Sequence, residues 1–127
     1  MPKKKLLIID DDEDICELLR LRFEIEGFEV HTAHNSHSFR NHVFTVNPDL
    51  VILDVMLGHE EGPEVYRKLL GEGMEKDLPV VFLTSLLDEG AQTPIRPGRT
   101  HGLYRKPVDV KSFVRDIKVC VGVGSEV

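Results

Sequence analysis

Leu6-Leu7-Ile8-Ile9-Asp10-Asp11-Asp12 is the stretch that decides the fold, because four apolar residues run directly into three carboxylates. An apolar run without polar alternation is typical of a strand that helices cover on both faces of a parallel sheet. Leu50-Val51-Ile52-Leu53 and Val80-Val81-Phe82-Leu83 have the same character, and they end at Asp54 and Thr84. The sequence therefore predicts a buried parallel sheet with polar side chains at one edge.

Two weaker candidates complete a set of five strands. Residues 28–33 alternate between apolar and polar, which favours an edge strand, and residues 103–105 form a short late candidate. Segments with helical periodicity separate the strands, so the chain is an α/β protein with a doubly wound five-stranded parallel sheet and helices on both faces. In such sheets ligands bind beyond the carboxyl ends of the strands.

The predicted helices have recognisable ends, except in one place. Start signals for four helices are Asp12, Asn35 or Ser36, Pro63 and Asp109, and Gly27 ends the first helix. Between Thr84 and Leu103, where a fourth crossover helix is expected, the chain contains Gly90, Pro94, Pro97 and Gly98. A proline inside a helix costs about 3 kcal/mol. We therefore expect an irregular or shortened fourth helix, with one or two turns around residues 86–92.

Composition limits the function classes. A chain of 127 residues with 41% hydrophobic and 30% charged residues suits one globular domain, which we expect over residues 1–121 with a flexible tail or linker at 122–127. The net charge of −6 argues against binding to nucleic acid or to an anionic membrane. Cys16 and Cys120 are interpreted as reduced core residues. The sequence shows no apolar segment long enough to span a bilayer and no secretory signal, so the expected compartment is the cytoplasm.

The polar residues at the strand ends suggest a metal site. Asp10, Asp11 and Asp54 would bring three carboxylates together, and these repel one another unless a cation intervenes. Mg²⁺ suits them because it takes oxygen ligands and leaves positions for phosphate oxygens. Lys106, directly after the last strand, supplies a second compensating charge.

The same edge can carry out phosphoryl transfer. A carboxylate beside a divalent cation, faced by an amine and a hydroxyl, can attack phosphorus and form an acyl phosphate. Asp54 is the candidate nucleophile, with Thr84 and Lys106 as its catalytic partners. The contribution of these groups would consist mainly of positioning and charge stabilisation.

Four motifs in order carry a resemblance to a known family: Ile8-Ile9-Asp10-Asp11-Asp12, Val51-Ile52-Leu53-Asp54-Val55-Met56-Leu57 with Gly62, Val81-Phe82-Leu83-Thr84-Ser85 and Lys106-Pro107. Together they resemble the response-regulator receiver family of bacterial two-component signalling, over residues 4–121. The resemblance implies a flavodoxin-like sheet with strand order 2-1-3-4-5. It also implies a signalling domain that catalyses only its own phosphorylation and dephosphorylation.

The resemblance further implies roles for single residues. Asp54 would accept a phosphoryl group from a partner histidine kinase or phosphotransfer protein. Asp11, Asp54 and the Met56 backbone carbonyl would bind Mg²⁺ directly, with Asp10 acting through a water molecule. Thr84 and Lys106 would contact the phosphoryl group, and the peptide bond between Lys106 and Pro107 is usually cis. The phosphorylated domain would switch its protein contacts, and a homodimer is conceivable.

The sequence departs from the family pattern at positions that bear on switching. Gly58 stands where the family usually has proline, four residues beyond the acceptor. Leu103 stands where an aromatic switch residue is common, and Tyr104, one step later on the strand, should face the other side of the sheet. These departures leave open a second reading, a weakly switching or phosphorylation-independent interaction module with the same fold.

The same residues also allow an enzyme hypothesis. Asp10 and Asp12 after an apolar strand, followed by Thr84 and Lys106, are similar to the motifs of haloacid-dehalogenase-type phosphatases, with Asp10 as nucleophile. That hypothesis leaves Asp54 without a role, and resemblance between short motifs does not establish function.

Three histidines around the second predicted helix, His34, His37 and His42, fit no zinc-binding spacing and are expected to be solvated side chains.

Overall fold

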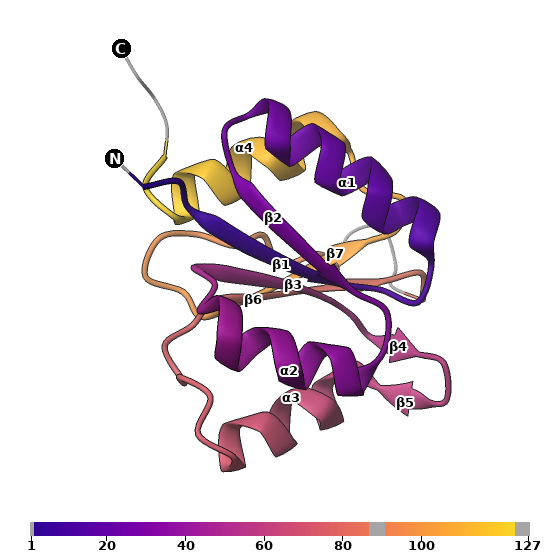
Figure 1. The fold of residues 1–127 in the computed structure, drawn as a ribbon. Coiled ribbons are helices and arrows are strands. Elements are labelled where there is room, and N and C mark those ends of the chain that lie inside the picture. The colour runs from indigo at the N-terminus through magenta and orange to yellow at the C-terminus, as the bar shows by residue number, and fades with distance from the viewer. Residues whose placement is uncertain (1, 87–90, 124–127) are drawn as a thin grey trace.

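A computed structural model of the protein describes residues 2–86 and 91–123. Five parallel strands form the main sheet, in the order β2-β1-β3-β6-β7, which confirms the predicted doubly wound topology (Figure 1). The strands are β1 (Lys5–Ile9), β2 (Glu29–Ala33), β3 (Leu50–Asp54), β6 (Val80–Thr84) and β7 (His101–Arg105).

Helices cover both faces of this sheet. Figure 1 shows α1 and α4 on one face and α2 and α3 on the other. The helices of the described residues are α1 (Glu13–Ile25), α2 (Ser36–Val46), α3 (Gly62–Gly71) and α4 (Val110–Cys120). Ile52 packs with Phe23 and Phe113 on one face, and its neighbour Leu53 packs with Phe39 on the other. This alternation explains why the strands are apolar throughout.

Most helix ends follow their sequence signals. The Asp12 side chain accepts hydrogen bonds from two backbone N–H groups in the first turn of α1, and the Asn35 side chain accepts one, from Ser38, at the start of α2. Gly27 follows α1 with a φ of 97°, a conformation that favours glycine. Two details differ: α3 begins at Gly62 rather than Pro63, and the Asp109 side chain before α4 accepts no capping hydrogen bond from the described backbone.

A short hairpin that the sequence did not predict follows β3. Its arms are β4 (Met56–Leu57) and β5 (Glu60–Glu61), which pair antiparallel. Gly58 lies in the connecting turn with a φ of 62°. The left-handed backbone at this position is accessible to glycine and not to proline, whose ring fixes a negative φ. Glycine in place of the usual proline at this position is therefore what the backbone of the hairpin turn requires.

The connection between β6 and β7 is irregular wherever it is described. The expected helical turns around residues 86–92 lie largely at 87–90, outside the described residues, and no helix is present in residues 91–100. Instead, Thr93 and Leu103 exchange two backbone hydrogen bonds, of 2.9 and 2.7 Å, as an antiparallel bridge at the outer edge of β7. Protection of an edge strand in this way limits pairing with other chains.

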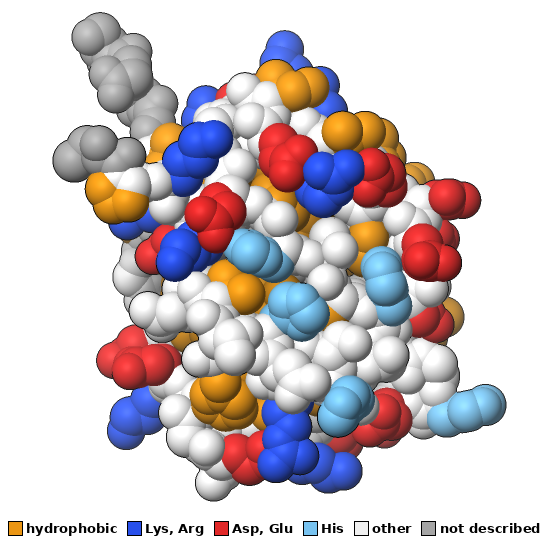
Figure 2. Space-filling view, in the orientation of Figure 1, with side chains coloured by type: hydrophobic (Ala, Val, Ile, Leu, Met, Phe, Trp, Pro, Cys, Tyr) orange, Lys and Arg blue, Asp and Glu red, His pale blue; other side chains and the backbone are white. Residues whose placement is uncertain are grey.

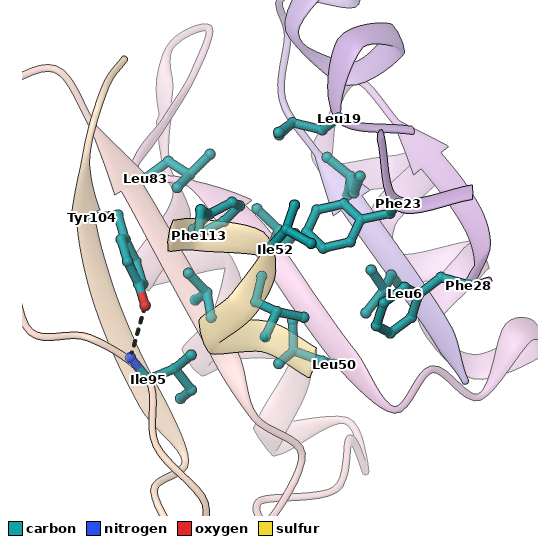
Figure 3. Packing of buried hydrophobic residues seen from close by; sticks show 14 of the residues in the cluster. Leu6, Leu19, Phe23, Phe28, Leu50, Ile52, Leu83, Ile95, Tyr104 and Phe113 are labelled. Carbon is teal, nitrogen blue, oxygen red and sulfur yellow. Dashed lines mark hydrogen bonds between the residues drawn. The ribbon is translucent and has the colours of Figure 1, made fainter. Parts of the chain in front are cut away.

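Tyr104 anchors this connection from the core. Its ring packs against Phe113 at a centroid distance of 4.8 Å, on the α1/α4 face of the sheet, which confirms that Tyr104 faces away from the side expected of an aromatic switch residue. Its hydroxyl accepts a hydrogen bond of 3.2 Å from the N–H of Ile95 (Figure 3) and donates one of 2.6 Å to Asp116. Ile95 is itself buried in the same cluster.

Removal of the Tyr104 hydroxyl should destabilise the protein. Tyr104→Phe leaves the buried N–H of Ile95 and the Asp116 carboxylate without this partner, and an unsatisfied buried group costs about 1–3 kcal/mol. We expect a decrease of this size in the free energy of unfolding, measured by urea denaturation. Tyr66→Phe is the control, because the hydroxyl of Tyr66 shares a hydrogen bond with the exposed His101 and, among the residues described, with no other group, so its loss should matter less. Equal losses in the two variants would contradict the anchoring role.

Two further expectations concern the whole chain. Residues 124–127 of the predicted tail lie outside the described residues. Cys16 and Cys120 are both free cysteines, as the sequence suggested. In the part of the chain that is described, none of the helices has the length and apolar character needed to span a membrane.

Candidate acidic site at the sheet edge

Three carboxylates meet at the carboxyl ends of the central strands. Ile9 of β1 pairs with Leu53 of β3, so the next residues, Asp10 and Asp54, lie side by side. Oxygen atoms of Asp10, Asp11 and Asp54 lie within 4.8 Å of one another. Asp10 is only 1% exposed and Asp54 only 7%, whereas Asp11 is exposed. The topology thus brings together the acidic residues that the sequence singled out.

The ammonium of Lys106 lies between two of these carboxylates. Its Nζ is 2.7 Å from Asp10 Oδ2 and donates a hydrogen bond of 3.0 Å to Asp54 Oδ2. The backbone N–H of Lys106 donates to the carbonyl of Thr84, which fixes the start of the loop after β7. The peptide bond from Lys106 to Pro107 is cis, as the resemblance implied.

Burial makes the negative charge of Asp10 costly. Desolvation raises the pKa of Asp10 to about 6, although the neighbouring Lys106 ammonium and the hydrogen bond from the Asp12 N–H act in the opposite direction. Burial alone would lower the pKa of Lys106. The ion pairs that its ammonium makes with the Asp10 and Asp54 carboxylates outweigh this effect, and the pKa rises. One ammonium therefore compensates the cluster only partly.

The donor set fits a divalent cation. Asp10 Oδ2 is buried and, among the described residues, accepts no well-oriented hydrogen bond, despite its ion pair with Lys106. Among the described residues, Asp11 accepts one backbone hydrogen bond, from Gly58, and Asp54 accepts one from the N–H of Met56 besides the one from Lys106. Carboxylate oxygens without nitrogen or sulfur neighbours are ligands for hard cations such as Mg²⁺.

The remaining predicted site residues lie at the same edge. Thr84 ends β6, beside β3 in the sheet, and its mostly buried hydroxyl accepts a hydrogen bond of 3.1 Å from the N–H of Leu86. Met56, at the start of β4, is 42% exposed, and its N–H donates to Asp54 Oδ1 at 3.2 Å. The structure thus places all six predicted site residues around one position.

Two residues at this edge were not assigned a role from the sequence. Gly62 lies so close to β3 that a Cβ atom there would be 2.2 Å from the backbone oxygen of Asp54. His34, after β2, places its Nδ1 3.1 Å from the backbone oxygen of Asp10. Gly62 is part of one of the four motifs that carry the family resemblance, but the sequence gives no physical reason for a glycine there. No local pattern distinguishes His34 from the other histidines. Figure 2 shows histidine side chains spread over one face of the molecule, so the composition of this surface does not single out any one histidine.

Comparison with known proteins decides the family. A family model described as the response regulator receiver domain matches residues 6–118. The chain belongs to this family. The receiver domain is thus a signalling domain of two-component systems, and the match gives no support to the haloacid-dehalogenase reading.

Individual relatives agree with this assignment. The polar-differentiation response regulator DivK of Brucella anthropi is 29% identical over 122 residues, which cover 96% of this receiver domain and 98% of DivK. The alkaline phosphatase synthesis transcriptional regulatory protein PhoP of Bacillus subtilis is 36% identical over 86 residues, or 68% of this chain. The match spans only 35% of PhoP, and 34% of the response regulator MprA of Mycobacterium tuberculosis.

Solved structures confirm the fold. The structure of a putative response regulator from Chloroflexus aurantiacus superposes with a TM-score of 0.78 at 25% identity, and covers 95% of this chain and 99% of that one. A CheY-like receiver domain protein from Methanospirillum hungatei gives a TM-score of 0.77 at 22% identity, with 95% of both chains covered. The receiver domain therefore shares the flavodoxin-like arrangement over nearly its whole length.

Proposed function

We propose that this receiver domain accepts a phosphoryl group on Asp54 from a partner histidine kinase or phosphotransfer protein, with the help of Mg²⁺. The observation that carries the proposal is the position of Asp54. Its carboxylate lies in a cluster of three acids and is bonded directly to the ammonium of Lys106. Among the three acids, Asp54 is the one that ends the central strand, β3. The neighbouring strand, β6, ends at Thr84, which carries a hydroxyl group.

In the proposed reaction, a carboxylate oxygen of Asp54 attacks the phosphorus atom of a phosphohistidine. The new O–P bond forms as the P–N bond to the donor breaks, and the donor imidazole leaves and takes up a proton. Lys106 Nζ, which lies 3.0 Å from Asp54, would bind one phosphoryl oxygen, and the Thr84 hydroxyl at the end of β6 would donate a hydrogen bond to another. Both groups stabilise charge without covalent chemistry of their own.

Asp10, Asp11, Asp54 and the Met56 carbonyl would hold the Mg²⁺ ion. When bound, it would neutralise charge on the carboxylates and on the phosphoryl oxygens. Two observations support this proposal: the negative charge of Asp10 is only partly compensated by Lys106, and the atoms available to bind the ion are all oxygens. The protein's own contribution is to hold these oxygens in place with β1, β3 and the β4–β5 hairpin.

A weakly switching or phosphorylation-independent module remains the second candidate function. The observation in its favour is Tyr104, which is fixed in the core by Asp116 and Ile95 on the face away from an aromatic relay. Under the main proposal, the phosphorylated domain changes its protein contacts without rotation of Tyr104. Under the alternative, the chain binds its target equally well with and without the phosphoryl group.

The test is labelling by a small phosphoryl donor. Wild type, Asp54→Asn and Asp77→Asn are incubated with acetyl phosphate and Mg²⁺, and the intact mass of each is measured. The wild type and Asp77→Asn, whose exposed carboxylate lies in the loop before β6, should gain the mass of one phosphoryl group. Asp54→Asn should gain none, because a neutral amide is a poor nucleophile.

Three outcomes would overturn the proposal. A phosphoryl adduct on Asp54→Asn, or one that forms on the wild type after Mg²⁺ has first been removed with EDTA, would show that the chemistry lies elsewhere. Absence of any adduct on the wild type, with folding verified by circular dichroism, would favour the phosphorylation-independent module.

A further inference from the structure

The backbone carbonyl of Asp10 is held by two side chains that the proposed phosphoryl transfer does not use. His34 Nδ1 lies 3.1 Å from this oxygen, and Cys16 Sγ lies 3.5 Å from it. On the other side, the Asp10 N–H donates to the carbonyl of Ala33 at 3.1 Å, so the two neighbours Ala33 and His34 hold both ends of the residue. A buried carbonyl requires a donor, and Asp10 is nearly inaccessible to solvent.

The contact between His34 and the Asp10 carbonyl requires a particular placement of a proton on the ring. A carbonyl oxygen only accepts hydrogen bonds, so Nδ1 must carry the proton in this contact. The other candidate donor, Cys16, is a weak one, and burial raises the pKa of its thiol to about 12, so it keeps its proton and contributes no charge. His34 is therefore the principal donor to the Asp10 carbonyl.

This carbonyl belongs to the peptide group that joins Asp10 to Asp11. The orientation of the peptide group sets the directions in which both side chains leave the backbone. Asp10 Oδ1 also accepts a hydrogen bond of 2.9 Å from the N–H of Asp12, and Asp11 Oδ2 accepts one of 3.1 Å from the N–H of Gly58. Rotation of the peptide group would move both carboxylates relative to Asp54, whose strand is fixed in the centre of the sheet.

A direct role for the His34 ring in metal binding does not fit. Nδ1 is committed to the Asp10 carbonyl, and Nε2 lies 3.9 Å from a carboxylate oxygen of Glu13, an exposed residue at the start of α1. Within the described residues, the acids that could share an ion are Asp10, Asp11 and Asp54, and His34 is not among them. Its contact with the site runs through the backbone alone.

We propose that His34 is a positioning residue for the acidic site, whose Nδ1–H holds the Asp10–Asp11 peptide group so that both carboxylates face the cation position. The inference rests on the proposed Mg²⁺-dependent function of that site. Groups that orient metal ligands from behind typically contribute 10-fold to 100-fold in metal affinity. The imidazole is partly exposed, so water can replace it in part, and the lower end of that range is expected.

The test compares His34→Leu with His34→Asn. Leucine removes the donor, whereas the asparagine amide nitrogen occupies nearly the position of Nδ1 and can donate to the same carbonyl. Mg²⁺ dissociation constants are measured by titration calorimetry, and labelling rates with acetyl phosphate are measured over a range of Mg²⁺ concentrations. We expect His34→Leu to weaken Mg²⁺ binding by about 10-fold. At saturating Mg²⁺ its labelling rate should approach that of the wild type, since Asp54 and Lys106 are unchanged.

His34→Asn should restore most of the affinity, and His37→Leu is the matched control. His37 is exposed on α2, and within the described part of the chain its side chain shares a hydrogen bond with Asn41 alone, so its replacement should leave Mg²⁺ binding unchanged. Nitrogen chemical shifts of the His34 ring, recorded by NMR, should show a proton on Nδ1. Wild-type affinity in His34→Leu, or no difference between His34→Leu and His34→Asn, would overturn the positioning role alone. A wild type that binds no Mg²⁺ would overturn both this role and the proposed function.

Discussion

Lys106→Met should lower the free energy of unfolding by about 3 kcal/mol when Mg²⁺ is chelated, because removal of one partner from a buried ion pair leaves an uncompensated charge. Here two carboxylates lose their partner, and Asp10 is nearly inaccessible to water. Excess Mg²⁺ should restore part of the loss, because the ion binds only to the folded state. Labelling of Asp54 should fall roughly 100-fold or more, as when a charge-stabilising donor is removed from a transition state.

Urea denaturation with EDTA and with Mg²⁺ measures the stability of this variant. Lys111→Met is the control, since Lys111 is an exposed lysine in the first turn of α4 and its loss should be nearly neutral. In the double variant Asp10→Asn/Lys106→Met, much of the stability should return because the most buried carboxylate is gone. Equal stability of wild type and Lys106→Met in EDTA would show that the ammonium does not compensate the cluster.

The fold was predictable because its signals repeat along the chain. Strands that read apolar at every position, such as Leu50–Leu53, specify burial on both faces, and helical periodicity between them specifies the crossovers. The β4–β5 hairpin was missed because arms of two residues are too short to show a period. The burial of Ile95 was also unpredictable, since a single isoleucine in a proline-rich loop carries no pattern, and its place depends on Tyr104.

The site was predictable to the extent that topology decides it. Residues that directly follow parallel strands must meet at one edge, which is why Asp10, Asp54, Thr84 and Lys106 were found from the sequence. The supporting groups were not predictable. His34 acts through a backbone carbonyl that no side-chain pattern reports, and the closeness of Gly62 to Asp54 depends on how α3 packs under the hairpin.

Gly62 is the position where a single methyl group should do most damage to the site. Its N–H donates to the carbonyl of Val55 at 2.6 Å, and a Cβ atom would lie 2.2 Å from the backbone oxygen of Asp54 and 3.3 Å from Leu53. Neither neighbour can easily move, because one is backbone and the other is a buried residue of the central strand. The Asp54 peptide group must therefore shift, together with the carboxylate that it carries.

We expect Gly62→Ala to lower the free energy of unfolding by about 1–3 kcal/mol, the usual cost of overpacking. Labelling of Asp54 should slow by up to about 100-fold, since a displacement near 1 Å is enough for such a loss. Gly71→Ala, at the other end of α3, has no atom within 4 Å of the added Cβ and should be neutral or stabilising by up to about 1 kcal/mol. Labelling at the wild-type rate in Gly62→Ala would mean that α3 moves away from β3, and that the position of Asp54 does not depend on this contact.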